Sequence, residues 1–476
     1  MNLHDLFKKT AEHFPDKPAV VQGHETVSYQ ALDGMISQIA QRLKSLGITR
    51  GQTIGLCFAN STACIALTYA LWKLDAAVVP IDVELKPDEI RQVSRYLKLS
   101  AVISHKAGNA GWQHEECPVV GIPYYFKRIN TAAGPATDIH IAFVRFTSGT
   151  TGERKGVVLS HERIFERIRS VNKTMQITPD DNVLWLLPMS HHFVSTIVLY
   201  LTEGATIVLA DGIWSRSILE TINQRHITLL YAAPFHYSLL AADTSNQGMP
   251  EVRLAVSTTI GLPADIHAHF SRRFGLSIAQ AYGIIEIGLI CINTEDPSGR
   301  PGSVGRILPD YKIRVENTPA YGEVDGVRCG ELFFSGPGFF DAYFHPWTDG
   351  EKALQNGWFE TGDIGGMDKE GFLYLYGRKN QVINRAGLKI FPEEIEAVFN
   401  RHPDVEESYV YGKAHDRLGQ IIVAKVVLRK NSGRVDEKTL KAFCSEALAA
   451  YKVPEQICFA DYLEKTVSTG KILRPR

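Results

Sequence analysis

The chain has 476 residues, of which 45% are hydrophobic and 22% are charged. These are the proportions of a globular protein, and the length predicts two or more domains. A balance of 51 basic and 52 acidic residues, with a formal charge of -1, argues against nucleic acid or an anionic membrane as partner. Seven cysteines without CxxC spacing argue against a zinc site or a disulfide framework. Because neither a secretory signal nor a membrane span is evident, a cytoplasmic protein is predicted.

The first part of the chain alternates helix-like and strand-like patterns. Apolar residues recur at helical spacing in some segments, and the short apolar runs between them are typical of buried strands. Strands that alternate with helices predict a mostly parallel, layered α/β sheet. Helices are expected at residues 3–14, 32–46, 62–74 and 87–97, and strands at residues 53–58, 76–81, 101–104, 183–187, 206–209 and 227–231.

The later part of the chain has a different pattern of predicted secondary structure. From residue 302 to 335 short strands and turns indicate a β-barrel-like part, and a polar segment, Arg378–Gln381, follows the strand expected at residues 372–376. Beyond it, helices and strands predict a compact α+β unit. The predicted fold class is therefore α/β. A large, multi-subdomain N-terminal domain (residues 1–379) combines layered α/β sheets with the barrel-like part, and a small α+β C-terminal domain follows (residues 380–476).

A glycine-rich run from Phe146 to Gly156 lies between apolar segments at residues 141–144 and 157–159. It contains three glycines, four hydroxyl side chains and one lysine, Lys155. Glycine permits the tight backbone that lets amide N–H groups and hydroxyls converge on phosphate oxygens. The run differs from the GxxxxGK[ST] loop, because no Ser or Thr follows the lysine. A phosphate cradle is predicted, and a flexible surface turn is the alternative.

Three further segments combine a turn with a side chain suited to nucleotide chemistry. Residues 280–286 present an aromatic ring, a glycine and then a carboxylate, which could stack on a purine and hold Mg²⁺. Residues 358–363 place an aspartate after a tight turn, where it could bind a ribose diol. Residues 468–472 place a lysine on a glycine-containing turn. Taken singly, each has an ordinary alternative: a core tyrosine with a solvated glutamate, a turn aspartate, and a solvated terminal lysine.

The order of these segments resembles the adenylate-forming superfamily of acyl-CoA synthetases, peptide-synthetase adenylation domains and luciferases. The resemblance covers essentially the whole length and looks closest to an acyl- or aryl-CoA ligase. It rests on residues 147–156, 188–191, 282–286, 330–332, 361–363, 377–378, 387–396 and 470–471.

The resemblance implies an ATP-dependent ligase with two half-reactions. A carboxylic acid is first converted to an acyl-AMP, and the acyl group then passes to a pantetheine thiol. The implied cofactors are ATP and Mg²⁺, with coenzyme A or phosphopantetheine as acyl acceptor and coenzyme A favoured. The C-terminal domain is expected to be mobile and to rotate about a hinge at Asn380 between the two steps.

The resemblance also assigns roles to individual residues. The phosphates of ATP would be held by Thr147, Ser148, Gly149, Thr150, Thr151, Gly152 and Lys155. The adenine would stack on Tyr282 beside Gly283, the ribose would bind Asp363 and Arg378, and Mg²⁺ would bind Glu286. Lys471 would bridge the substrate carboxylate and the α-phosphate. His191 completes the expected catalytic set, where it would line or gate the acid pocket and not act as a base, because a carboxylate is already ionised at neutral pH.

The acid pocket is expected to include His192, Phe193, Phe235, Gly261 and Ile284. A mixed aromatic and apolar lining suits an aryl acid or a short-to-medium acyl chain. No aspartate is placed to pair with an α-ammonium group, which argues against an amino-acid substrate.

The chain departs from the family pattern at Ile285, where a threonine is usual. Loss of that hydroxyl removes a hydrogen bond worth about 0.5–1.5 kcal/mol. Three alternatives to the CoA ligase therefore stay open at this point. The acid could be loaded onto an acyl or aryl carrier protein, the chain could be a degenerate nucleotide-binding homologue, or it could be a light-emitting specialist on the same scaffold.

Overall fold

The computed structural model describes residues 1–106, 115–116, 124–129, 137–146, 155–317, 321–386, 388–430, 435–465 and 472. The chain forms two compact units, and each is described here by itself. Unit 1 consists of residues 1–301, 308–311 and 336–354, and unit 2 of residues 302–307, 312–335 and 355–476. The domain boundary at residues 379 and 380 stays a prediction.

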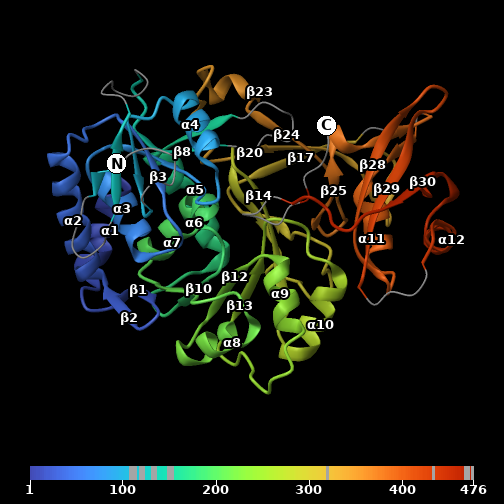
Figure 1. Ribbon diagram of the computed structural model, residues 1–476, viewed down its shortest axis with the longest axis horizontal. Coiled ribbons are helices and arrows are strands. Elements are labelled where there is room, and N and C mark those ends of the chain that lie inside the picture. Colours follow the sequence, from blue (N-terminus) through green and yellow to red (C-terminus); the bar gives the residue numbers. More distant parts are fainter. Residues whose placement is uncertain are drawn as a thin grey trace. The chain divides into compact units, whose positions relative to one another are not determined.

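Unit 1 contains two large sheets whose central strands are parallel (Figure 1). The first sheet has the order β15 (Gly288–Ile292), β14 (Ile278–Ile284), β13 (Leu254–Ser257), β12 (Leu229–Ala232), β10 (Asn182–Trp185), β11 (Thr206–Leu209), β1 (Pro18–Gln22) and β2 (Glu25–Ser28). The second has the order β22 (Thr348–Asp349), β21 (Ala342–Tyr343), β9 (Gly156–Ser160), β8 (Ile141–Phe146), β4 (Ala77–Pro80), β3 (Thr53–Cys57), β5 (Ala101–Ser104), β7 (Tyr125–Arg128) and β6 (Glu115–Glu116). The layered α/β prediction is confirmed.

The helices of unit 1 begin where the sequence supplies a cap. The hydroxyls of Ser28, Ser61 and Ser160 each accept a backbone N–H three residues ahead, at the start of α2, α3 and α5. Proline fills the first turn of α4 and of α9. The helices are α1 (Leu3–His13), α2 (Tyr29–Ser45), α3 (Thr62–Lys73), α4 (Pro87–Tyr96), α5 (His161–Met175), α6 (Met189–His192), α7 (Ile197–Thr202), α8 (Ser215–Gln224), α9 (Pro234–Ala241) and α10 (Ala264–Phe274), with 3-10 turns η1 (Phe193–Ser195) and η3 (Gly350–Ala353). None of the helices in the described part of the chain combines the length and the apolar character that a membrane crossing requires.

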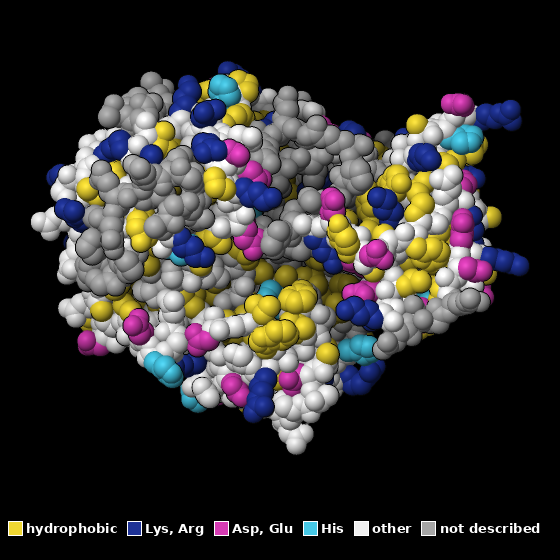
Figure 2. Space-filling model, viewed as in Figure 1, with side chains coloured by type: hydrophobic (Ala, Val, Ile, Leu, Met, Phe, Trp, Pro, Cys, Tyr) yellow, Lys and Arg dark blue, Asp and Glu magenta, His cyan; other side chains and the backbone are white. Residues whose placement is uncertain are grey.

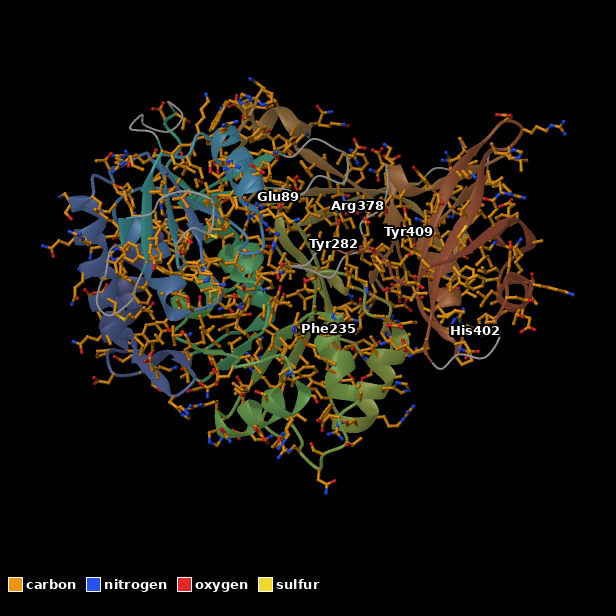
Figure 3. All side chains as sticks on the ribbon, viewed as in Figure 1. Glu89, Phe235, Tyr282, Arg378, His402 and Tyr409 are labelled. Atoms are coloured by element: carbon orange, nitrogen blue, oxygen red, sulfur yellow. The ribbon has the colours of Figure 1, made fainter. Side chains whose placement is uncertain are left out.

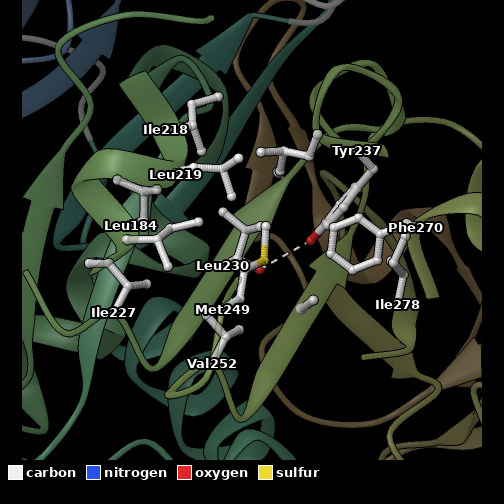
Figure 4. Packing of buried hydrophobic residues seen from close by; sticks show 14 of the residues in the cluster. Leu184, Ile218, Leu219, Ile227, Leu230, Tyr237, Met249, Val252, Phe270 and Ile278 are labelled. Atoms are coloured by element: carbon white, nitrogen blue, oxygen red, sulfur yellow. Dashed lines mark hydrogen bonds between the residues drawn. The ribbon is translucent and has the colours of Figure 1, made fainter. Parts of the chain in front are cut away.

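A large hydrophobic core fills the space between the first sheet and helices α8, α9 and α10. Figure 4 shows Leu184, Ile218 and Phe270 among the residues packed there, all buried. Tyr237 is fully buried in this core, and its hydroxyl lies 3.2 Å from the carbonyl of Leu230 and 2.8 Å from that of Val256. The ring therefore adds apolar burial without leaving its polar end unpaired.

Unit 2 joins a β-rich part to the α+β part at the end of the chain. The β-rich part is an antiparallel sheet of β17 (Lys312–Asn317), β20 (Gly330–Ser335), β24 (Trp358–Met367) and β25 (Leu373–Arg378), with short strands β16 (Arg306–Ile307), β18 (Glu323–Val324), β19 (Val327–Arg328) and β23 (Leu354–Gln355). The α+β part contains β26 (Ile383–Arg385), β27 (Leu388–Ile390), β28 (Val405–His415), β29 (Gly419–Leu428), β30 (Gln456–Phe459), α11 (Pro392–Phe399), α12 (Glu437–Ala447) and the turns η4 (Lys379–Gln381) and η5 (Ala450–Lys452).

Two sequence predictions of local structure are wrong in an instructive way. Residues 280–286 do not begin with a turn, because β14 continues through Tyr282 and Gly283 to Ile284. Thr361 to Asp363 are not a tight turn. They lie within β24, at a point where the pairing with β20 skips from Glu360 to Ile364. Three residues thus oppose one, so the segment is a β-bulge, which changes the direction in which its side chains point.

A buried arginine on α5 fixes the loop between β14 and β15. Arg167 is 2% exposed, and its guanidinium donates to the carbonyls of Ile285 at 3.0 Å, Glu286 at 2.7 Å and Gly338 at 2.6 Å. Its side chain passes two glycines at positive φ. A Cβ on Gly288 would lie 2.9 Å from it, and a Cβ on Gly338 would lie 2.6 Å from it. Only glycine leaves room for the arginine at these two positions.

We expect Arg167→Met to destabilise unit 1, because methionine fills similar space but leaves three buried carbonyls without a donor. The loss should be about 3 kcal/mol or more, lowering the midpoint of thermal unfolding by about 5–10 °C in scanning calorimetry. Arg169→Met is the matched control, since this arginine is exposed on the same helix. Equal midpoints for the two variants would contradict the proposed role of Arg167.

Candidate functional site

The predicted phosphate loop joins two paired strands of the second sheet. Phe146 pairs with Gly156, so β8 and β9 form a hairpin whose connection is the glycine-rich run. Thr147, Ser148, Gly149, Thr150, Thr151 and Gly152 lie outside the described residues. Lys155 at the end of the run is described. It is exposed, and its Nζ lies 4.6 Å from the centre of the Tyr343 ring.

The predicted metal ligand lies beside the same tyrosine. The hydroxyl of Tyr343 donates to Oε1 of Glu286 at 3.3 Å. Burial raises the pKa of Tyr343, and the neighbouring Glu286 carboxylate raises it further, so the phenol keeps its proton. Tyr343 thus contacts both Lys155 and Glu286. The structure brings together a cation and a carboxylate that are far apart in the sequence.

His191 is part of a chain of three polar side chains. Arg145, near the end of β8, lies 3.1 Å from Nδ1 of His191, and Nε2 of His191 lies 3.3 Å from Oδ2 of Asp82. Asp82 follows β4, and His191 belongs to the short helix α6. The predicted catalytic histidine is therefore held from both sides of its ring.

The predicted adenine-binding segment is part of β14. Tyr282 is 8% exposed. A Cβ on Gly283 would lie 2.3 Å from the carbonyl oxygen of Gly288, so only glycine permits this close approach of β14 and β15. The side chain of Gln280 accepts the backbone N–H of Leu262 at 2.9 Å and ties β14 to the loop that contains Gly261. Gly261 itself is exposed, with no atom within 4 Å of the position a Cβ would take.

The residues predicted for the acid pocket lie in different environments. His192 is partly buried near the rings of Trp185 and Tyr231, at 6.3 and 6.0 Å. Phe193 is 3% exposed and lines a small apolar pocket. Ile284 is partly buried at the end of β14. Phe235 is 55% exposed at the start of α9. Figure 2 shows hydrophobic side chains gathered where Figure 3 labels Phe235.

In unit 2, the predicted ribose-binding residues form an ion pair. Asp363 and Arg378 are paired residues of β24 and β25, and Nε of Arg378 lies 2.7 Å from Oδ1 of Asp363. Asp363 is 6% exposed, its backbone N–H donates to the hydroxyl of Thr361 at 3.0 Å, and Arg378 also donates to the carbonyl of Thr361 at 3.1 Å. The bulge in β24 and the arginine thus hold the carboxylate in one orientation.

The predicted hinge follows directly after this pair. Asn380 is exposed in the turn η4. The preceding residue, Lys379, pairs with Glu331 at 2.7 Å and with Glu360 at 2.9 Å. The hydrogen bonds that Lys379 donates to Glu331 and then to Glu360 raise its pKa. Lys471, the predicted catalytic lysine, lies outside the described residues.

Sequence reasoning missed Tyr343, Arg145, Arg167 and Asp82. Arg145 and Arg167 had a signal that could have been used, because each interrupts an otherwise apolar pattern, in β8 and on the buried face of α5. Tyr343 and Asp82 had none, because a tyrosine or an aspartate near a strand end is common.

The side chains near Glu286 can be tested for their fit to the expected magnesium ion. Mg²⁺ prefers oxygen ligands and usually binds through one or two carboxylates together with substrate phosphates. Glu286 supplies such an oxygen, partly buried beside Tyr343. Within the described ranges, no group of three or more His, Cys, Asp or Glu side chains could hold a metal ion. The residues present therefore fit an ion shared with the phosphates of a nucleotide.

Comparison with known proteins identifies the family of the chain. The family model described as AMP-binding enzyme matches residues 7–344, and the model described as AMP-binding enzyme C-terminal domain matches residues 394–471. An uncharacterized acyl–CoA ligase of Bacillus subtilis (strain 168) is 30% identical, with 100% of this chain and 98% of that protein covered. Indoleacetate–CoA ligase of Aromatoleum aromaticum (strain DSM 19018 / LMG 30748 / EbN1) is 27% identical, with 99% and 96% covered.

A solved structure gives the same result for the fold. The chain is similar to O-succinylbenzoate coenzyme A synthetase from Bacillus subtilis in complex with AMP, with a TM-score of 0.85 and 25% identity over 98% of this chain and 97% of that one. Since the family model spans well over half of the sequence, the chain belongs to the AMP-binding enzyme family of adenylate-forming proteins.

Proposed function

We propose that the protein activates a carboxylic acid with ATP to an acyl-AMP, releasing pyrophosphate, and then transfers the acyl group to the thiol of coenzyme A, releasing AMP. The enzyme is an acid–thiol ligase of the AMP-forming acyl-CoA synthetase type. Relatives with this activity in their names match it over almost their entire length. The observation that carries the residue-level proposal is the contact of Tyr343 with both Lys155 and Glu286.

The chemistry of the first step explains why these groups would be gathered. Attack of a carboxylate on the α-phosphorus brings two anions together, so positive charge must lie where negative charge accumulates. Lys155 would neutralise the β- and γ-phosphates as pyrophosphate leaves. Glu286 would hold the magnesium ion that, when bound, reduces the charge on the phosphate oxygens. Tyr343 would keep both side chains oriented by its ring and its hydroxyl.

Residues of unit 2 would bind the ribose and supply the lysine used in adenylation. Asp363, held in place by Arg378, would accept hydrogen bonds from the ribose hydroxyls with its carboxylate. Lys471 would lie between the acid carboxylate and the α-phosphate. It serves only the first step, so a rotation about Asn380 would move it away before the thiol attacks.

The acceptor is proposed to be coenzyme A, because the relatives described above are named CoA ligases or CoA synthetases. Loading of a carrier protein would use the same pantetheine thiol. The acid is proposed to be an aryl acid or a short-to-medium acyl acid, from the mixed aromatic and apolar residues His192, Phe193 and Ile284.

A panel of carboxylic acids should identify the activity directly. We expect pyrophosphate release that depends on one class of acid, and thioester formation with coenzyme A at a rate well above that with a pantetheine-bearing carrier protein. Pyrophosphate would be followed by a coupled assay and thioesters by mass spectrometry. ATP binding without turnover on any acid would favour a degenerate homologue instead.

Replacement of Glu286 by glutamine should weaken the binding of the magnesium ion used in the first step. The amide keeps the size of the side chain but removes its charge, so the half-saturating Mg²⁺ concentration should rise about tenfold or more. The readout is acid-dependent ATP–pyrophosphate exchange as a function of Mg²⁺. Glu220→Gln, at a partly exposed helical position, is the control. An unchanged Mg²⁺ curve for Glu286→Gln would remove Glu286 from the metal site.

Lys471→Ala should separate the two half-reactions. Adenylation should fall by at least about a hundredfold, since a cation at the transition state is lost, while thioester formation from preformed acyl-AMP should be largely kept. The exposed Lys438→Ala variant, also in the C-terminal part, should leave both steps unchanged. Equal loss in both steps for Lys471→Ala would contradict the division of roles.

A further inference from the structure

Arg145 is a cation that the proposed reaction does not yet use. It lies on β8, directly before the glycine-rich run. Side chains alternate along a strand, so Arg145 shares a face with Phe143, whereas Phe146 points to the opposite face and meets Tyr96 at 5.5 Å. Phe143 is 2% exposed, whereas Arg145 is only partly buried. On this face of β8, solvent therefore reaches Arg145 but not Phe143.

The hydrogen bond from Arg145 defines the protonation state of His191. A guanidinium can only donate, so Nδ1 of His191 is the acceptor in the 3.1 Å contact and carries no proton. The proton of a neutral ring must then be on Nε2, which donates to Asp82 at 3.3 Å. His191 is therefore a neutral spacer between a cation and a carboxylate. It cannot act as a base through Nδ1 while Arg145 is bound there.

The hydrogen-bond partner of Arg145 is a histidine and not a carboxylate. In the part of the chain that the structure describes, no carboxylate lies within ion-pair distance of its guanidinium, and its bond to His191 uses one of five N–H groups. Burial lowers the pKa of Arg145 to about 10, and the Glu286 carboxylate partly opposes this, so the side chain is charged at neutral pH. A partly buried cation that, among the described residues, pairs with no carboxylate is stabilised when an anion binds it.

The surroundings of Arg145 indicate which anion that is. The strand register places Arg145, Val157 and Tyr343 in one row across β8, β9 and β21, so Tyr343 and its partner Glu286 lie on one side. On the other side, Phe143 lines a small apolar pocket together with residues just before and after His191, namely Met189, Ser190 and Phe193. Arg145 therefore lies between the groups proposed to bind phosphate and magnesium and an apolar lining. A molecule with a carboxylate and an organic body fits this boundary better than a phosphate does.

We propose that Arg145 binds a carboxylate group of the acid substrate and so determines which acids are accepted. This inference rests on the proposed acid-activating function. The planar guanidinium can take a carboxylate in a bidentate pair, and the neutral His191 keeps its plane fixed. The carboxylate is either the one that reacts with ATP or the second one of a dicarboxylic acid, and the chemistry of recognition is the same.

The test compares Arg145→Leu and Arg145→Lys with the wild-type chain in acid-dependent pyrophosphate release. For Arg145→Leu we expect the KM for the acid to rise about tenfold to hundredfold, as the loss of a charge-assisted pair implies, with the KM for ATP changed by less than about threefold. Arg145→Lys keeps the charge and should recover part of the acid affinity. Should the leucine variant not fold, the lysine variant alone must still raise the acid KM and spare the ATP KM. Arg169→Leu on the exposed face of α5 is the control.

Matched acids distinguish the two sources of the carboxylate. With glutarate against valerate and terephthalate against benzoate, loss for both members of a pair assigns the reacting carboxylate, and loss for the diacid alone assigns a second one. Either result supports the proposal. An ATP KM that rises as much as the acid KM, or no change in either, overturns it while leaving the acid–thiol ligase activity intact. A wild-type chain that releases pyrophosphate with no acid at all overturns the proposed function and this inference together.

Discussion

The geometry of unit 1 depends on one buried guanidinium. From α5, Arg167 donates to two carbonyls of the loop between β14 and β15 and to one carbonyl of the segment before β21. Because Gly288 and Gly338 leave no space for a Cβ beside it, the arginine and the two glycines form a single constraint. Three backbone carbonyls stabilise its charge by accepting its hydrogen bonds.

The hydrogen bonds of Arg167 also fix the backbone at Ile285, the residue that departs from the family pattern. Ile285 lacks the usual hydroxyl, but its carbonyl accepts from Arg167 at 3.0 Å, so the backbone of the loop does not depend on its side chain. By the family resemblance, the chain would lack one hydrogen-bond donor to the nucleotide at Ile285. The region nevertheless remains rich in positive charge, since Arg145, Arg167 and Lys155 lie around Glu286 and Tyr343. A reaction that joins two anions is consistent with that balance of charge.

The two units differ in how their charged and aromatic side chains are arranged. In unit 1, charge and aromatic rings gather at strand ends and loops, which suits phosphates and an organic acid. In unit 2, a β-bulge and an antiparallel pair hold Asp363 and Arg378 together, which suits a neutral diol that needs fixed acceptors. Lys379 next to this pair is tied to two glutamates of the same unit, so the segment before Asn380 is anchored by charge while Asn380 itself is exposed.

The amino-acid sequence by itself determined the alternation of helices and strands, the class of fold and the family, because hydrophobic period, caps and the order of short motifs are local properties. Residues 206–209 and 101–104, for example, were predicted as strands with the bounds that β11 and β5 have. Only the tertiary structure decided which side chains meet. Arg145 and His191 are 46 positions apart, Glu286 and Tyr343 are 57, and Arg167 and Ile285 are 118. Such partners are chosen by strand register, a bulge and the packing of a helix against a loop, and none of these leaves a mark within a short stretch of sequence.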